Sequence, residues 1–236
     1  MNRLPILMYH NVIPNQALSS GLSIAAQNLE SQFSYLMEAG FTSFHFSDLE
    51  SKTILPKKSV VITFDDVTVN QLIYAVPLLK KYHLKATFFV PLAYLGKADL
   101  WNQGKEPIMT VEQLQQLDDN IELGLHSYAH NKYAAMSEAE IMQDFEKCFA
   151  TIAQNKLKVA PILAYPYGNY PKKDPQKTRF VSILKQHSIA FGLRIGNKRN
   201  RFPFQNPYEI TRIDIKGQDS LLRFKLKLRF GKLKLF

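Results

Sequence analysis

Two short segments combine residue types that could bind a metal ion and hydrolyse a bond. The first, residues 59–66, is an apolar, β-branched run that ends in two adjacent carboxylates, Asp65 and Asp66. Folding alone does not explain this pair, because neighbouring like charges at the end of an apolar strand repel each other and resist losing water. Further along the chain, another strand-like run ends in His126 and His130. The two segments therefore supply a carboxylate and two imidazoles for a divalent metal, and they leave one carboxylate spare.

The chemistry that suits this set is metal-assisted hydrolysis of an amide or ester. A catalytic zinc site usually has three protein ligands and an open position, which Asp66, His126 and His130 could provide. Asp65, beside the metal but not bound to it, could then act as general base. An Asp-Asp pair alone is more often a solvated turn, and His-x-x-x-His alone is more often structural. The position of both after apolar strands makes the combination more specific.

Alternating strand-like and helix-like segments must position these residues. Hydrophobic patterns and turn signals predict strands over Pro5–His10, Val60–Phe64, Lys85–Val90, Glu122–Leu125, Ile162–Tyr165, Ala190–Leu193 and Glu209–Ile213. They predict helices over Gln27–Ala39, Asn70–Tyr82, Thr110–Leu117, Ser137–Gln154 and Arg179–His187. Repeated βα units of this length predict an α/β fold with a parallel sheet or barrel. In a barrel, catalytic groups sit where the strands end, and Asp65 and His126 are at such positions.

Length, cysteine content and the N-terminal sequence limit the classes to which the protein can belong. The 236 residues suffice for one large α/β domain or two small ones. No apolar run reaches the roughly 20 residues of a transmembrane helix, and residues 1–12 resemble a first strand more than a signal peptide. The single cysteine, Cys148, excludes an internal disulfide and lies among apolar residues at helical spacing, which favours a packing role. These features predict a cytoplasmic protein, with peripheral contact at the inner membrane face left open.

The net charge of +10 is unevenly distributed. All of the basic excess lies in residues 172–236, which favours an anionic partner such as a phosphorylated substrate, a membrane surface or a nucleic acid. No nucleic-acid recognition motif accompanies it, and a merely solvated basic face is the simpler alternative. In Leu221–Phe230, basic and apolar residues alternate, and this period of two predicts a strand. Its apolar face could pack on the fold, while Arg223, Lys225, Lys227 and Arg229 could contact an anionic membrane.

Several segments together resemble a known family. Thr63-Phe64-Asp65-Asp66 and His126-Ser127-Tyr128-Ala129-His130 resemble the first two motifs of the polysaccharide deacetylases, carbohydrate esterase family 4. Lys85–Val90 resembles the next barrel strand of that family, and Ala164–Gly168 resembles its third motif. Leu7–His10 is similar to the opening of the subgroup that deacetylates poly-β-1,6-N-acetylglucosamine.

The resemblance covers roughly residues 4–215 and implies a fold, an activity and residue roles. It implies a distorted seven-stranded (β/α) barrel as a single domain, over residues 1–215, with residues 216–236 as a basic amphipathic C-terminal segment. It implies that Asp66, His126 and His130 bind a divalent metal, most simply Zn²⁺. The implied catalytic residues are the base Asp65, the acid His10, the oxyanion donor Tyr167 through its backbone N–H, and Arg212.

Two departures from the family pattern affect these roles. The family usually has glycine after the Asp pair, where this chain has Val67; a β-branched residue disfavours positive φ, so the loop is expected to differ in shape. The third motif usually begins with an arginine that orients the base, and here that position is Ala164. Arg212, near the end of a late strand, is the candidate replacement. Tyr94 and Trp101 follow the Lys85–Val90 strand and could either pack or stack on a sugar.

The resulting prediction is a metal-dependent N-deacetylase that acts on an N-acetylhexosamine in a surface glycan or a lipid-phosphate-linked intermediate. One alternative is a C–N hydrolase acting on a non-sugar amide. Another is a catalytically impaired barrel, altered at Val67 and Ala164, that binds an anionic glycan or a membrane surface. Retention of Asp65, Asp66, His126 and His130 argues against this last alternative.

Overall fold

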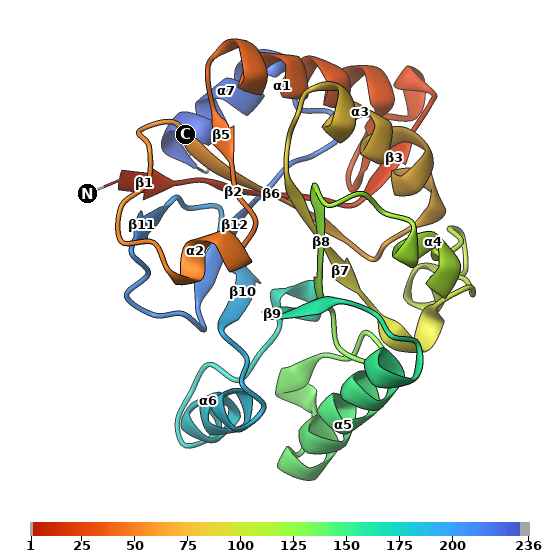
Figure 1. Cartoon of the computed structure of the whole chain (residues 1–236), viewed down its shortest axis with the longest axis vertical. Helices are drawn as coiled ribbons and strands as arrows, with labels where there is room; N and C mark the ends of the chain where they lie inside the picture. The colour runs from red at the N-terminus through yellow and green to blue at the C-terminus, as the bar shows by residue number, and fades with distance from the viewer. Residues whose placement is uncertain (1, 232–236) are drawn as a thin grey trace.

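Seven parallel strands close into a barrel with helices around the outside (Figure 1). This is seen in a computed structural model that describes residues 2–231. The ring closes because the first strand pairs in register with both the second and the last, Leu7 opposite Ile62 on one side and Ile213 on the other. In ring order its strands are β2 (Ile6–Tyr9), β6 (Ser59–Asp65), β7 (Ala86–Val90), β8 (Ile121–Leu125), β9 (Val159–Ala164), β10 (Phe191–Ile195) and β12 (Ile210–Asp214). The predicted seven-stranded (β/α) barrel is confirmed.

The alternation of side chains along β6 explains how this strand carries both core and site residues. Successive side chains of a strand point to opposite faces. Val60, Ile62 and Phe64 pack outward into the large apolar cluster beneath the helices. Val61 instead belongs to the smaller cluster inside the barrel, and Asp65, four residues on, shares its inward face. The strand thus delivers a carboxylate to the barrel interior at the end where it finishes.

The helices cover the outside of the barrel, and all but the second and the last are close to those predicted. They are α1 (Ala26–Glu38), α2 (Ser47–Glu50), α3 (Val76–Lys81), α4 (Val111–Gln115), α5 (Glu138–Gln154), α6 (Gln176–Gln186) and α7 (Leu221–Phe230). Thr110 and Ser137, at which two of the predicted helices begin, each form a capping box with the residue three positions on. A π-type turn, η2 (Gln71–Ala75), precedes α3 within the predicted Asn70–Tyr82 helix. Cys148 is fully buried in α5, as predicted.

Short elements complete the fold around the barrel. Single-turn helices are η1 (Gln16–Leu18), η3 (Leu92–Tyr94), η4 (Leu100–Asn102), η5 (Tyr133–Ala135) and η6 (Pro166–Gly168). The remaining strands are β1 (Asn2–Leu4), which pairs with β11 (Asn200–Phe202), β3 (Asn11–Ile13), which pairs with β4 (Ser23–Ala25), and β5 (Thr42–Ser43), which adds to β6. None of the helices in residues 2–231 is long and apolar enough to cross a membrane.

The strand predicted over Leu221–Phe230 is wrong, because this segment forms helix α7. Ser220 caps it by accepting a hydrogen bond from the Arg223 amide, which begins a helix rather than a strand. Phe224 and Leu228, four residues apart, are buried on one face, and the ring of Phe224 meets Tyr35 of α1 edge-on. Every second residue is apolar here, but only those at helical spacing are buried. Of the predicted basic segment 216–236, residues 232–236 lie outside the described residues.

Candidate active site

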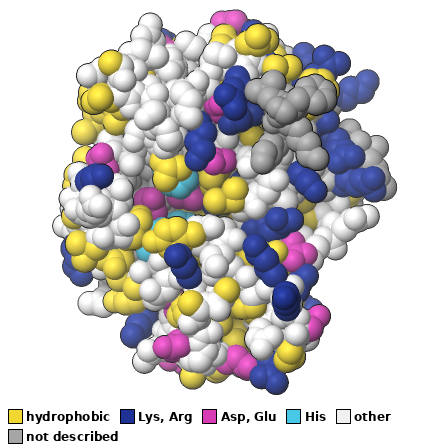
Figure 2. Space-filling view, turned by 180° about the vertical axis from the view of Figure 1, so that it is seen from behind, with side chains coloured by type: hydrophobic (Ala, Val, Ile, Leu, Met, Phe, Trp, Pro, Cys, Tyr) yellow, Lys and Arg dark blue, Asp and Glu magenta, His cyan; other side chains and the backbone are white. Residues whose placement is uncertain are grey.

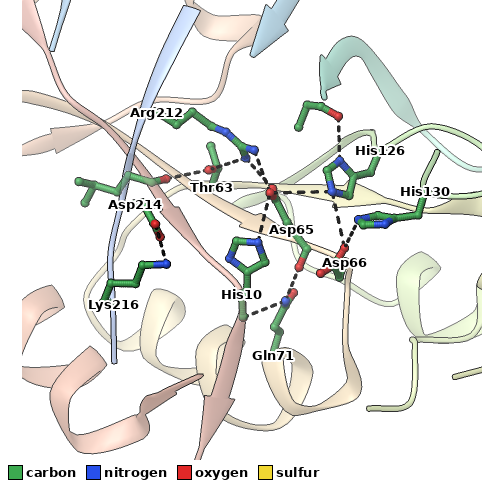
Figure 3. A network of polar contacts seen from close by, with 12 residues as sticks. His10, Thr63, Asp65, Asp66, Gln71, His126, His130, Arg212, Asp214 and Lys216 are labelled. Carbon is green, nitrogen blue, oxygen red and sulfur yellow. Dashed lines mark hydrogen bonds and ion pairs between the residues drawn. The ribbon is translucent and has the colours of Figure 1, made fainter. Parts of the chain in front are cut away.

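Five predicted site residues converge where the barrel strands end (Figure 3). His10 directly follows β2, and Asp66 directly follows β6, whose last residue is Asp65. His126 directly follows β8, and His130 lies four residues beyond it in the same loop. On the surface, histidine and acidic side chains lie at the bottom of a hollow bordered largely by apolar groups (Figure 2). Strands far apart in the sequence thus place these groups together, as expected for a parallel barrel.

Asp66, His126 and His130 are arranged as a possible metal-binding set. Their candidate ligand atoms all lie within 4.8 Å of one another. Oδ1 of Asp66 is 3.6 Å from Nε2 of His126 and 3.3 Å from Nε2 of His130. This oxygen is buried and has no hydrogen-bond partner among the described residues. A buried carboxylate oxygen facing two imidazole nitrogens suits a divalent cation of the kind that accepts nitrogen and oxygen ligands, and the residues present therefore fit a metal.

The surroundings of His126 keep it in the form that a metal requires. Its Nδ1 lies 2.8 Å from the carbonyl oxygen of Ala164 and donates to it, which directs the lone pair of Nε2 toward Asp66. Burial lowers the pKa of His126 to about 4, against the opposing effect of Asp65. The imidazole is therefore neutral at neutral pH. Ala164, where the family motif usually has an arginine, thus fixes a ring orientation through its backbone.

Asp65 is held by a bidentate pair with Arg212. The two guanidinium nitrogens of Arg212 lie 2.5 and 2.8 Å from the two carboxylate oxygens, and the arginine is fully buried inside the barrel. The same guanidinium donates to the hydroxyl of Thr63 at 3.3 Å, and it lies over the ring of Phe89. Burial raises the pKa of Asp65, but the charges of Arg212, His126 and His10, together with the hydrogen bond from Arg212, outweigh burial and hold the pKa well below its usual range. The carboxylate is therefore ionised.

Two histidines flank the second oxygen of Asp65 without binding it directly. Nε2 of His10 lies 3.7 Å from Oδ2, and Nε2 of His126 lies 3.9 Å from the same atom. His10 keeps a small exposed surface, whereas Asp65 is almost fully buried. The carboxylate thus lies between the candidate metal set on one side and an imidazole that borders solvent on the other. This is a suitable arrangement for separate base and acid groups.

Two positioning residues were not found from the sequence. The side-chain amide of Gln71, fully buried, donates to the backbone oxygens of His10 and Asp65 at 3.0 and 2.6 Å and so ties the ends of β2 and β6 together. Asp144 of α5 accepts hydrogen bonds from the Tyr128 amide at 3.0 and 3.1 Å and from the Tyr133 hydroxyl at 2.9 Å. It thereby holds the loop between the two histidines. The sequence did contain a sign of Asp144: it is a charged residue on the face of the predicted helix that is otherwise apolar.

The loop after the aspartate pair takes the conformation that valine was expected to avoid. Val67 has φ of 45° and Asp66 has φ of 77°, so the β-branched side chain does not keep this residue out of the positive-φ region, and the expected difference from the family's loop shape stays a prediction. Tertiary contacts override the local preference. The Val67 side chain is fully buried in the main apolar cluster, and its carbonyl accepts a 2.9 Å hydrogen bond from the Met109 amide.

Aromatic residues surround the outer ligand, His130. The Trp101 ring stacks on His130 with centroids 4.1 Å apart and planes at 18°, and Tyr94 meets Trp101 edge-on. Packing, one of the two roles considered for Tyr94 and Trp101, is therefore observed. The ring of Tyr167, in the η6 turn after β9, meets His130 edge-on at 4.8 Å, is half exposed, and has the Lys132 ammonium over it. His130 is thus held between rings, and its Nδ1 has no hydrogen-bond partner among the described residues.

Comparisons with known proteins agree on the class of protein that this fold and site define. A family model described as polysaccharide deacetylase matches residues 52–189. The chain therefore belongs to the polysaccharide deacetylase family, and it is an enzyme of the carbohydrate deacetylase type.

Among individual proteins, it is 30% identical over 211 residues to a poly-beta-1,6-N-acetyl-D-glucosamine N-deacetylase of Staphylococcus epidermidis, covering 81% of this chain and 67% of that protein. A Staphylococcus aureus enzyme of the same name is 28% identical over the same length.

Solved structures support the fold. IcaB from Ammonifex degensii superposes with a TM-score of 0.78 at 22% identity, covering 97% of this chain and 98% of that one. A Streptococcus pyogenes deacetylase in complex with acetate superposes with a TM-score of 0.76 at 20% identity, covering 96% and 98% of the two chains.

Proposed function

We propose that this protein removes the N-acetyl group from N-acetylhexosamine units of a surface glycan, with a divalent metal, most simply Zn²⁺, held by Asp66, His126 and His130. The observation that carries the proposal is the buried Asp66 oxygen facing two imidazole nitrogens, next to an ionised Asp65 paired with Arg212. The match to deacetylases of poly-β-1,6-N-acetylglucosamine supports a β-linked N-acetylglucosamine polymer as the substrate class.

Each proposed role follows from the position of a residue. A metal bound to the Asp66 set supplies Lewis-acid chemistry, because it acidifies water and polarises a carbonyl. Asp65 accepts a proton from the attacking water, since its carboxylate is ionised and lies beside that set. Arg212 holds both oxygens of Asp65 and so fixes its orientation.

The leaving group and the oxyanion need donors of their own. As the C–N bond breaks, the amine nitrogen takes a proton, which His10 supplies from the solvent-bordering side of Asp65. The backbone N–H of Tyr167, in the turn that borders His130, stabilises the negative charge that develops on the acetyl oxygen. One water molecule is consumed as the amide bond is cleaved. The products are acetate and a free amine, and the proton that Asp65 takes from water is matched by the proton that His10 gives to the amine.

Acetate release is the direct test. The purified protein is incubated with β-1,6-linked N-acetylglucosamine oligomers, with and without a chelator, and Zn²⁺ is then restored. Release that stops with chelator and returns with metal is expected, and metal analysis of His126→Ala should show metal loss relative to wild type. Equal metal content in the two proteins would show that His126 is not a metal ligand and would contradict the proposed site. Acetate release that resists the chelator would show that the reaction does not need the metal.

A lipid-phosphate-linked sugar remains a second candidate substrate. The basic C-terminal part of the chain suggested this substrate, because cations could bind its phosphate. The cations of α7, however, lie away from the candidate site. Acetate release from a lipid-linked N-acetylhexosamine at a higher rate than from the free oligomer would favour it.

A further inference from the structure

Six cationic side chains line a cavity of about 390 Å³ at the end of the barrel where the strands begin. They come from four separate stretches of chain: Arg3, Lys57 with Lys58, Arg199, and Lys225 with Arg229. Ser59, the first residue of β6, also lines this cavity, whereas Asp65, the last, belongs to the candidate active site. At about 3.3 Å per residue, the two sites lie roughly 20 Å apart along the strand.

No carboxylate in the described part of the chain balances the charge of these cations. No acidic residue lines the cavity, and none of the six makes an ion pair with another described residue. Surface lysines elsewhere do have such partners, as Lys80 does with Asp118. Burial lowers the pKa of Arg199, and the charges of Arg3 and Arg229 lower it further. The fold therefore holds like charges together, an arrangement that an external anion would relieve.

Other contacts hold several of these cations in place without neutralising them. The Lys58 ammonium donates to the carbonyl of Ala39 at 2.7 Å. The Lys225 ammonium lies over the ring of Tyr35, 4.4 Å from its centroid. Part of the cavity wall is thus preorganised, and its lining also includes the apolar residues Pro5, Phe41 and Leu228.

Helix α7 adds exposed apolar groups beside the cations. Leu222 and Phe230 are 68% and 56% exposed, and with Leu226 they recur every four residues along one outward stripe. Lys225 and Arg229 each directly precede a member of this stripe. An apolar stripe next to cations matches the interfacial region of an anionic membrane, which offers acyl chains and phosphates together. A soluble polyanion offers only the charge.

We propose that this end of the barrel binds the surface of an anionic phospholipid membrane, with lipid phosphates at the cationic cavity and the α7 stripe at the acyl boundary. The candidate active site then faces away from that membrane, toward a glycan that extends from it. The proposal does not depend on the catalytic reaction.

The structure also changes which residues of the C-terminal segment can take part. Lys227 is 9% exposed, and its ammonium contacts Asp219 and the carbonyl of Asp214. Arg223 pairs with the same Asp219 at 3.2 Å. The prediction that four basic residues of this segment face a membrane is therefore wrong for Lys227, whereas Arg223 is exposed but already paired with Asp219. Among the described basic residues of α7, Lys225 and Arg229 make no ion pair, and cations from elsewhere in the sequence join them at the cavity.

Co-sedimentation with phospholipid vesicles tests the proposal. Wild type is mixed with phosphatidylcholine vesicles with or without phosphatidylglycerol, at low and high salt. A test variant combines Arg3→Gln, Lys57→Gln, Arg199→Gln and Arg229→Gln, and spares Lys58 and Lys225 because of their internal contacts. A control variant loses the same charge at exposed lysines without ion pairs, through Lys105→Gln, Lys156→Gln, Lys173→Gln and Lys185→Gln.

The expected result is binding of wild type and control to phosphatidylglycerol vesicles at low salt and release at high salt, with at least about tenfold weaker binding of the test variant. Circular dichroism checks that every variant is folded, and Leu222→Ser should weaken vesicle binding in the otherwise wild-type protein. No wild-type binding, or equal losses in the two charge variants, overturns the proposal. Binding to single-stranded DNA as tight as to vesicles, with no effect of Leu222→Ser, would assign the cavity to a soluble polyanion instead.

Discussion

At the end of the barrel where the strands finish, the fully buried guanidinium of Arg212 is matched by both oxygens of Asp65. At the end where they begin, the described cations around Arg199 have no carboxylate within ion-pair distance. One end uses its charges internally, to fix the geometry of a reactive group. The other leaves its charges uncompensated, which suits recognition of something outside the molecule. A count of charged residues would treat the two ends alike, although their physical roles differ.

The energetic consequences of the two arrangements also differ. Removing one member of a buried, hydrogen-bonded ion pair leaves an uncompensated charge in the interior and costs about 3–5 kcal/mol. Removing an exposed cation costs little and can even relieve repulsion. Substitutions at the active-site end should therefore affect both catalysis and stability, whereas substitutions of the cations at the basic end should affect binding with little effect on stability.

The largest expected effect is that of Asp65→Asn on turnover. The amide cannot accept the proton of the attacking water, so acetate release should fall by about 10²–10⁴-fold, the usual contribution of a general base. Metal content should stay near that of wild type, because Asp65 lies outside the proposed ligand set. Asp118→Asn, at an exposed carboxylate, is the control and should keep full activity. Loss of metal together with activity would show that the roles of Asp65 and Asp66 are interchanged.

Replacing Arg212 tests the paired end of the comparison directly. Arg212→Met leaves Asp65 buried without its cation, so the free energy of unfolding should fall by about 3–5 kcal/mol in denaturant titrations. The pKa of Asp65 should also rise, because the positive charge that lowers it is gone. A base with a higher pKa is protonated over a wider acidic range, so the acid limb of the pH–rate profile should move to higher pH.

Arg212→Lys separates charge from geometry in the same pair. The single ammonium keeps the charge but cannot form the fork that contacts both oxygens. Its acid limb should therefore stay nearer to that of wild type than the limb of Arg212→Met, while turnover still drops. An unshifted acid limb in Arg212→Met would mean that Arg212 does not control the protonation of Asp65.

The barrel and the central site residues could be predicted because local patterns encode them. An apolar strand ending in carboxylates and another ending in histidines fix both the element and the position of Asp65 and His126 along it. The family resemblance added the roles, which remain proposals. The sequence identified Arg212 only as an arginine near the end of a late strand. Its pairing with Asp65 could not be predicted from local patterns, because it depends on closure of the barrel.

The failures arose where tertiary contacts decide the outcome. The alternation in Leu221–Phe230 is typical of a strand, but Phe224 and Leu228 are also spaced as on one face of a helix. The segment forms a helix because these two residues are buried and Phe224 packs on α1. Val67 adopts positive φ because its carbonyl and side chain are both held by distant segments. Gln71 gave no signal at all, since its two acceptors are backbone oxygens. The predicted cytoplasmic location stays a prediction.

A smaller effect on the active-site end is expected from Asp144→Ala. The loop between His126 and His130 loses the acceptor for the Tyr128 amide, so the two imidazoles are less well ordered. Loss of such an outer partner typically weakens metal binding by about 10–100-fold, which a competition titration with a chelator can measure. Tyr133→Phe removes only the hydroxyl bond to Asp144 and should change metal affinity much less. Equal effects of the two variants would mean that the loop is not held through Tyr128.

The smallest expected effect concerns the capping of α7 and tests whether the two ends are energetically separate. Ser220→Ala removes the hydroxyl that accepts from the Arg223 amide, and loss of such a cap lowers the free energy of unfolding by about 1 kcal/mol. Ser182→Ala is the matched control: that serine lies within α6 and bonds a carbonyl one turn back, so its loss should be nearly neutral. Because α7 carries Lys225 and Arg229 but no proposed catalytic group, Ser220→Ala should weaken vesicle binding slightly and leave acetate release per folded molecule unchanged. A clear loss of acetate release would show that α7 supports the catalytic end through the barrel, and the distinction between the two ends would then fail.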